Sequence, residues 1–333
     1  MAGKSGRTIL SEQKRTVRDV LLRWETLLLF IFIAVNIMNM SLSKNYLVAK
    51  NLFTNINTFM VKGLIALPMA YILLLGDIDL SVGAIVCLCG TVLGIVFNAS
   101  GSLALAIGAC IAAGIVCGMF NGLILTKFPE LAPMIVTLAT TTLYRGIAER
   151  ILGDTSTKGM QKIAWFKDLY YGKIGPVPYL FIFFCVLAVI FALVMHKTAF
   201  GRHMYAIGAN KTAAEYAGIK VQKVRFTVFT LTGFICAVSA VFYCAWMGSV
   251  KSDIAEGYEL EAISMCVLGG ISTDGGKGNF AGAIIAIFII GLLRYGLGLI
   301  NVNGQTIRVI IGVLLIIVVM LPNLRIGKKR SGL

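Results

Sequence analysis

The chain has 333 residues, of which 58% are hydrophobic and only 14% are charged, and its mean hydropathy is +0.88. Soluble domains carry about a quarter charged residues, so this composition excludes an ordinary soluble domain and predicts a multi-pass membrane protein. The net charge is +15, but the basic residues gather in particular loops and form no basic stripe with aromatics between them, so we expect no nucleic-acid partner. The eight cysteines lie in apolar segments without a CxxC pair, which predicts packing residues and no metal site.

The first 24 residues are polar and basic, and they lack the short n-region and the small-residue cleavage site of a secretory signal. We therefore expect residues 1–24 to be a basic cytoplasmic segment that precedes an uncleaved first span. Ten candidate spans follow, most of them close to the roughly 20 residues that cross a bilayer: residues 25–42, 58–75, 80–98, 103–125, 131–151, 176–195, 226–248, 259–272, 279–300 and 306–322. The fifth span is polar and the eighth is short.

The basic residues indicate which side of the membrane each loop faces. With a cytoplasmic N-terminus, 18 of the 30 basic residues fall in inside loops, mainly at the termini and in the loop of residues 196–225. The positive-inside rule then places both termini in the cytoplasm, which requires an even number of spans. The sequence predicts an all-α integral membrane protein of about ten transmembrane helices, with a membrane domain at 25–322 and a basic cytoplasmic tail at 323–333.

The stretch LLLGDIDLSVGA, residues 73–84, places Asp77 and Asp79 between apolar runs, where an unpaired charge is costly. Three explanations stay open. The pair can form a solvated turn in which Asp79 caps a helix beginning near Leu80, with Ser81 beside it. It can line a wet cavity at a helix break and accept hydrogen bonds from a substrate, or it can carry protons. The first two are compatible, because a cap also holds a break open.

Small residues recur four apart, at Gly90 and Gly94 and again at Gly114, Gly118 and Gly122. In lipid, such ridges let helix backbones approach closely, because van der Waals packing drives helix association there. We expect a compact bundle.

The polar fifth span offers hydroxyl groups at Thr137 and Thr140, about one helical turn apart. They can donate and accept hydrogen bonds, although threonine in a span more often bonds its own backbone. Arg145 and Glu149 stand four apart and are expected to pair on one helix face. The residues predicted to line a substrate pathway are Asp77, Asp79, Ser81, Thr137 and Thr140.

The loop at residues 196–225 contains a short predicted helix from Lys211 to Ala217, with Asn210 as its N-cap and Gly218 as its stop. A loop that only joins two spans does not require a capped helix. Two interpretations remain, a solvated basic loop and a docking helix for a cytoplasmic partner.

Residues 266–283, CVLGGISTDGGKGNFAGA, form a second glycine-rich interruption. The pattern GxxxxGK[ST] is not met, because Ile271 stands at the first glycine position and Gly278 follows Lys277, so we expect no nucleotide site of that kind. Both this stretch and LGDIDLSVGAIV lead into GAI-type helices that end in a tight hairpin. Glycine-broken segments in corresponding positions point to a candidate internal duplication and to the substrate path.

Four ordered segments together resemble one known family: GDIDLSVGA, TLATTTLYRGI, KTAFGRHMYAIGANKTAAEYAGIKV and GYELEAISMCVLGGISTDGGKGNFAGA. They are similar to permease subunits of bacterial ATP-binding cassette importers for ribose and related small sugars, over about residues 25–322. Two departures stand out. The usual family form has glycine where Asp77 stands, and STDGGKG replaces a more common apolar-to-glycine loop.

The resemblance implies a multi-pass protein of the bacterial inner membrane that is not an enzyme and holds no cofactor of its own. It implies three kinds of partner: a cytoplasmic ATPase that binds ATP and Mg²⁺, an extracytoplasmic sugar-binding protein, and a second permease, identical or paralogous. The loop at 196–225 would be the coupling element that drives alternating access. The residues assigned to coupling are Asn210, Ala213, Ala214, Glu215, Ala217 and Gly218.

The C-terminal stretch GLGLINVNGQTIRVIIGVLLIIVVMLPN looks closest to the rhamnose and autoinducer branch, while ribose and galactose stay open as substrates. An ion-coupled secondary sugar transporter is the alternative, although ionisable residues at mid-span depth are nearly absent from the sequence. An integral membrane enzyme would need a nucleophile, an acid–base pair or a metal cluster, and two histidines on one loop do not provide that.

Overall fold

The computed structural model describes residues 24–153, 155–314 and 316, so nearly all of the predicted basic segment at 1–24 and the tail at 323–333 lie outside the described residues. The helices up to the first hairpin are α2 (Trp24–Leu42), α3 (Ala49–Leu74), α4 (Val82–Ser100), α5 (Leu103–Lys127), α6 (Pro133–Leu152), the 3-10 turn η1 (Met160–Lys162) and α7 (Ala164–Tyr171). A two-residue antiparallel hairpin, β1 (Lys173–Ile174) with β2 (Val177–Pro178), separates them from α8 (Tyr179–Lys197), α9 (Ala199–Ala209), α10 (Lys211–Tyr216), α11 (Val221–Met247), α12 (Tyr258–Leu268) and α13 (Phe280–Leu299). A last helix covers Gly304–Leu314.

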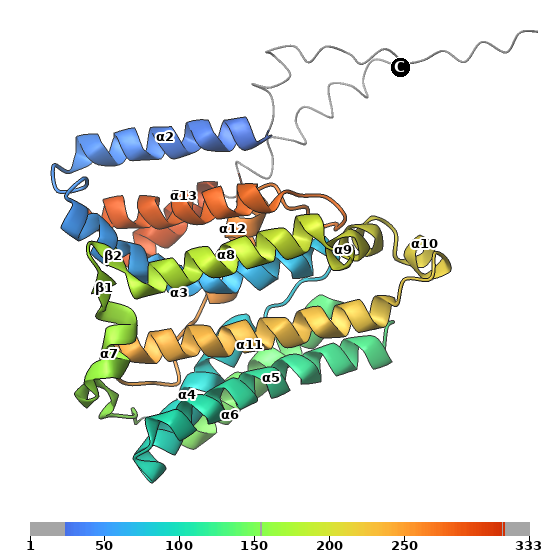
Figure 1. Cartoon of the computed structure of the whole chain (residues 1–333), viewed down its shortest axis with the longest axis horizontal. Coiled ribbons are helices and arrows are strands. Elements are labelled where there is room, and N and C mark those ends of the chain that lie inside the picture. Colours follow the sequence, from blue (N-terminus) through green and yellow to red (C-terminus); the bar gives the residue numbers. More distant parts are fainter. Residues whose placement is uncertain (1–23, 154, 315, 317–333) are drawn as a thin grey trace, which may run out of the picture.

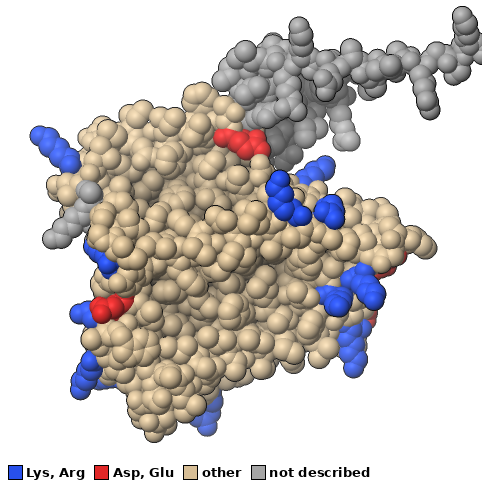
Figure 2. Space-filling view, viewed as in Figure 1, with Lys and Arg blue, Asp and Glu red and all other residues tan. Residues whose placement is uncertain are grey.

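The long helices run side by side along one direction (Figure 1). The short elements α7, β1 and β2 lie at one end of this bundle, the α7 end, and α9 and α10 lie at the other, the α10 end. Lysine and arginine gather mainly toward these two ends, with a mostly uncharged band between them (Figure 2). An apolar belt between charged ends is the surface that a bilayer-spanning bundle presents to lipid and water.

Helix α3 is the centre of the bundle. In its most apolar stretch 89% of residues are buried, against 17% in α2, which lies at the edge of the bundle (Figure 1). Large apolar side chains such as Phe30 on α2, Val116 on α5 and Ile190 on α8 point outward and are exposed. In water such an apolar surface would drive aggregation, so these faces are suited to contact lipid tails.

The predicted glycine ridge brings α5 and α11 together. A Cβ atom added to Gly114 would lie 2.5 Å from the carbonyl oxygen of Gly233, and one added to Gly118 would lie 2.5 Å from that of Phe229. Real Cβ atoms do not come that close, so these backbones touch where glycine alone fits. The prediction of a compact bundle is confirmed here.

Within the described residues, seven helices are long and apolar enough to cross a bilayer: α2, α3, α4, α5, α8, α11 and α13. The polar fifth span is the 20-residue α6. The short eighth span is α12, whose 11 residues extend about 16 Å, half a bilayer. The tenth is described only in part, so the total of ten, the side of the termini and the internal duplication stay predictions.

Candidate functional site

The chain breaks between α3 and α4, at residues 75–81. The break begins with a left-handed Gly76 (φ +79°), and the amides of Gly76 and Asp77 donate back to the carbonyls of Leu73 (2.9 Å) and Ile72 (3.1 Å). This is the hydrogen-bond pattern of a helix C-terminal cap. The amide of Gly276 donates to the carbonyl of Leu74 at 2.8 Å, so the two glycine-rich interruptions lie against each other at the α10 end.

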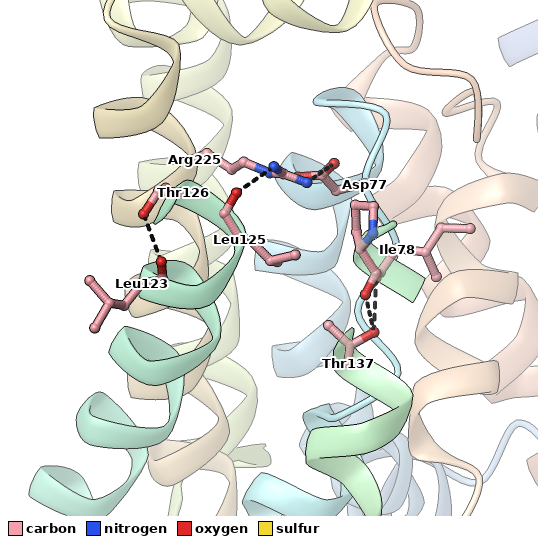
Figure 3. Close-up of polar contacts among 8 residues, drawn as sticks. Asp77, Ile78, Leu123, Leu125, Thr126, Thr137 and Arg225 are labelled. Atoms are coloured by element: carbon pink, nitrogen blue, oxygen red, sulfur yellow. Dashed lines mark hydrogen bonds and ion pairs between the residues drawn. The ribbon is translucent and has the colours of Figure 1, made fainter. Parts of the chain in front are cut away.

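Threonines of α6 bond the non-helical backbone that follows, and Figure 3 shows the contact of Thr137 with Ile78. The Thr137 hydroxyl lies 3.1 Å from both the carbonyl oxygen of Ile78 and the amide nitrogen of Leu80, and the Thr141 hydroxyl donates to the Leu80 carbonyl at 2.9 Å. Thr140 donates to the carbonyl of Thr137. Non-helical backbone at membrane depth is tolerated only where such partners exist. Thr137 and Thr140 are therefore engaged with backbone.

Asp79 lies within the break and is buried, with 1% of its surface exposed. Its Oδ1 accepts hydrogen bonds from the amide (2.8 Å) and the hydroxyl (2.6 Å) of Ser81, the Ser81 oxygen accepts from Asn121 on α5, and Tyr144 on α6 donates to Asn121. The second oxygen, Oδ2, has no hydrogen-bond partner among the described residues. The predicted cap is wrong in position, since α4 begins at Val82 and Asp79 forms a local turn with Ser81.

Asp77 is paired with Arg225, the second buried charge of the break (Figure 3). The guanidinium of Arg225 donates to both carboxylate oxygens of Asp77, from Nε to Oδ2 at 2.5 Å and from Nη2 to Oδ1 at 2.9 Å. Its Nη1 donates to the carbonyl of Leu125, at the end of α5, at 2.8 Å. A solvated turn is therefore the wrong explanation for the two aspartates, because Asp77 is 8% exposed and is neutralised by Arg225. In the sequence, Arg225 is only one of the basic residues of the loop at 196–225.

The loop at residues 196–225 contains the predicted short helix as α10, and it also contains α9, which the sequence did not predict. Helix α10 is capped by Asn210, whose Oδ1 accepts from the Ala213 amide at 2.9 Å, and it stops before Gly218 (φ +81°). Ala214 is buried and anchors α10, whereas Ala213, Glu215 and Ala217 are exposed. Tyr216, which sequence reasoning missed, is 90% exposed. Four residues separate α10 from α11, and Arg225 lies in the second turn of α11.

A second charged cluster occupies the interior nearer the α7 end. Glu261 of α12 accepts both from Lys62 of α3 (2.8 and 2.9 Å) and from Arg294 of α13 (2.7 Å). The sequence-based expectation that ionisable groups are nearly absent at mid-span depth is therefore wrong. Lys62 and Arg294 each stand alone in an apolar run, and Glu261 follows Glu259 by two residues, so no local pattern revealed that the three meet.

A second break, residues 248–257, leads from α11 into the half-length α12. Arg145 of α6 donates to the carbonyls of Ser252 (2.9 Å) and Ile254 (3.4 Å) and lies 3.9 Å from Glu256. Arg145 therefore bonds the second break, and the ion pair expected between Arg145 and Glu149 is not among the contacts of the described residues. This second break packs against the start of α4, where a Cβ on Gly83 would lie 2.6 Å from the Ala255 carbonyl oxygen.

Comparisons with known proteins agree with this architecture. Residues 51–319 match the family described as branched-chain amino acid transport system / permease component. Among similar proteins are the autoinducer 2 import system permease proteins LsrD of Klebsiella pneumoniae subsp. pneumoniae (30% identical, covering 92% of this chain and 94% of the relative), Enterobacter sp. (29%, 92% and 95%) and Yersinia pestis (32%, 89% and 90%). No solved structure has significant similarity to the chain.

Proposed function

The chain belongs to the branched-chain amino acid transport system / permease component family, and from this premise we propose that it is the substrate-translocating subunit of an ATP-binding cassette importer for a small sugar. Membership makes it a multi-pass permease of the bacterial inner membrane, with the apolar helices that such a protein needs. The family description names amino acids, but the curated relatives that match over about nine-tenths of the chain are autoinducer 2 import permeases. Together with the four sequence motifs, they favour a polyhydroxylated substrate of the ribose, rhamnose or autoinducer type.

The observation that carries the proposal is α10. It is a capped helix at the end of the bundle, anchored by Ala214 and presenting Ala213, Glu215 and Tyr216 to solvent. Exposed aromatic and polar groups on a rigid short helix suit a protein partner. We assign α10 to docking of a cytoplasmic ATPase that binds ATP and Mg²⁺, so the α10 end would face the cytoplasm, the side that the positive-inside rule also predicts for both termini. The other assigned partners are an extracytoplasmic sugar-binding protein and a second permease, identical or paralogous.

A continuous set of contacts leads from α10 into the membrane. Motion of α10 pulls on the start of α11, which carries Arg225, and Arg225 holds Asp77 and the end of α5. Asp77 begins the break, and Thr137 ties the same break to α6. Closure of the ATPase pair would shift these elements together and change access at the cytoplasmic end of the pathway. Asp77 then holds the break, and Thr137 and Thr140 support it. Asp79 and Ser81, both buried in this structure, stay the residues proposed to line the pathway.

Uptake into proteoliposomes tests the proposal against the ion-coupled alternative, which the intramembrane cluster of Lys62, Glu261 and Arg294 would suit. The permease complex is reconstituted with its ATPase and binding protein, and accumulation of labelled ribose, rhamnose, galactose and autoinducer 2 is followed. We expect ATP to drive uptake that an uncoupler leaves unchanged. Uptake without ATP that collapses with the ion gradient would overturn the proposal.

A further inference from the structure

A cavity of about 550 Å³ lies near the α7 end, between α3, α11, the second break and the helix Gly304–Leu314. Trp246, near the end of α11, lines the cavity. Its ring stacks on that of Tyr170 of α7 with 5.5 Å between the centroids, so the cavity lies close to α7. The volume falls within the range of about 300–1,000 Å³ that small-molecule sites occupy. None of the residues that the sequence analysis assigned to the substrate pathway lines it.

The lining combines hydrogen-bond donors, acceptors and aromatic faces. Lys62, Lys251 and Arg308 supply donors. Asp253 and Glu256, both exposed, supply acceptors. Tyr243, Trp246 and Tyr258 supply aromatic faces. Carboxylates repel a simple anion and the ammonium groups repel a simple cation, whereas a neutral molecule with many hydroxyl groups uses both and packs its C–H faces on the rings.

Several of these groups are held in place before any ligand binds. The Lys62 ammonium is fixed by Glu261 at 2.8 Å and lies 4.7 Å from the centre of the Tyr258 ring. Tyr243 meets Trp246 edge to face at 5.8 Å. Ala255, which also lines the cavity, has a left-handed backbone (φ +59°) that non-glycine residues rarely adopt and that clusters at functional sites. Preorganised groups lose less entropy on binding.

We infer that this cavity binds a neutral polyhydroxylated molecule of monosaccharide size, as the first site that the substrate meets within the permease. The inference rests on the proposed transport function, which places the α7 end outside the cell. The carbonyl of Ala255, a residue that lines the cavity, lies against Gly83 in the first turn of α4, two residues beyond Ser81. The wall of the cavity therefore contacts the helix that follows the first break.

Cysteine protection tests the site without depending on transport. Ser249 lines the cavity, so the Ser249→Cys variant of the complete complex is labelled with a membrane-impermeant thiol reagent in nanodiscs, with and without D-ribose, L-rhamnose or D-galactose. Ser100→Cys is the matched control, since Ser100 is exposed at the hairpin between α4 and α5. The unmodified complex gives the background from the native cysteines. Inorganic phosphate and choline serve as anion and cation probes.

We expect at least one sugar to slow labelling at Ser249→Cys by about tenfold when present at about ten times its dissociation constant, while labelling at Ser100→Cys is unchanged. A second variant, Asp253→Asn, should weaken that protection severalfold, because Asp253 is an exposed acceptor on the cavity wall.

Protection by phosphate or choline alone, or equal labelling with every probe, would overturn the inferred site. Parallel uptake measurements separate the two proposals. If ATP-driven sugar uptake persists while no sugar protects Ser249→Cys, the site is wrong and the function stands. If a sugar protects Ser249→Cys but uptake does not require ATP, the function is wrong and the site stands.

Discussion

The two breaks in the bundle are built in opposite ways. The first, residues 75–81, is closed: its backbone is bonded by Thr137 and Thr141, and Asp77 is neutralised by the buried Arg225. The second, residues 248–257, is open: Asp253 and Glu256 are exposed, and the segment borders a cavity. Under the proposed function, the closed break is suited to pass motion between the helices bonded to it, and the open break leaves exposed polar groups accessible to a ligand.

The largest expected effect comes from removing the cation of the closed break. Arg225→Met leaves Asp77 buried without a partner, which costs about 3–5 kcal/mol because an unpaired charge remains in a low-dielectric interior. We expect a large fall in melting temperature and in yield of the detergent-purified complex. Lys223→Met, on an exposed position of the same helix turn, is the control and should behave like the unmodified chain. Equal stability of the two variants would mean that the pair is not needed to hold the break.

The next effect concerns the backbone of the closed break. Thr137→Val removes the hydroxyl that serves both Ile78 and Leu80, so about 1–3 kcal/mol is lost through unsatisfied backbone groups. Hydrogen–deuterium exchange should rise at residues 78–81. Thr142→Val is the matched control, because the exposed Thr142 bonds only within its own helix. Unchanged exchange in Thr137→Val would show that other groups support the break.

The open break should respond more mildly. Arg145→Met removes the donor shared by the carbonyls of Ser252 and Ile254, a loss of about 1.5 kcal/mol for charged hydrogen bonds at a partly exposed site. Faster exchange confined to residues 252–256, with little change in global stability, is the expected result. Arg150→Met, exposed on the same helix, is the control. A global loss of stability would show that the open break is as integral to the bundle as the closed one.

The smallest effect on stability is expected outside both breaks. Tyr216→Ala on α10 should change stability by less than about 0.5 kcal/mol, because the side chain is 90% exposed. Its effect should instead appear as weaker capture of the ATPase in a pull-down from reconstituted complexes. Tyr171→Ala, also exposed but at the α7 end, should leave capture intact. Equal capture by both variants would remove Tyr216 from the docking surface.

The comparison also shows what the sequence could and could not reveal. Local signals were sufficient for α10, where Asn210 and Gly218 mark both helix ends, and for the glycine ridge of α5. Partners distant in sequence were not predictable. Asp77 and Arg225 are 148 residues apart, and Arg145 bonds carbonyls more than 100 residues away, although Glu149 stood one turn from it. Local spacing identifies helix ends and faces, but only the tertiary fold decides which buried charges meet.

In the proposed mechanism, motion of α10 reaches the closed break through Arg225 and Asp77. The most direct test is the double variant Arg225→Met with Asp77→Leu, which removes both charges together and so avoids leaving either one unpaired. In proteoliposomes that hold the complete complex, ATP hydrolysis and sugar uptake are measured side by side. The account predicts a folded complex that still hydrolyses ATP but accumulates little sugar per ATP. Uptake per ATP equal to that of the unmodified complex would contradict it.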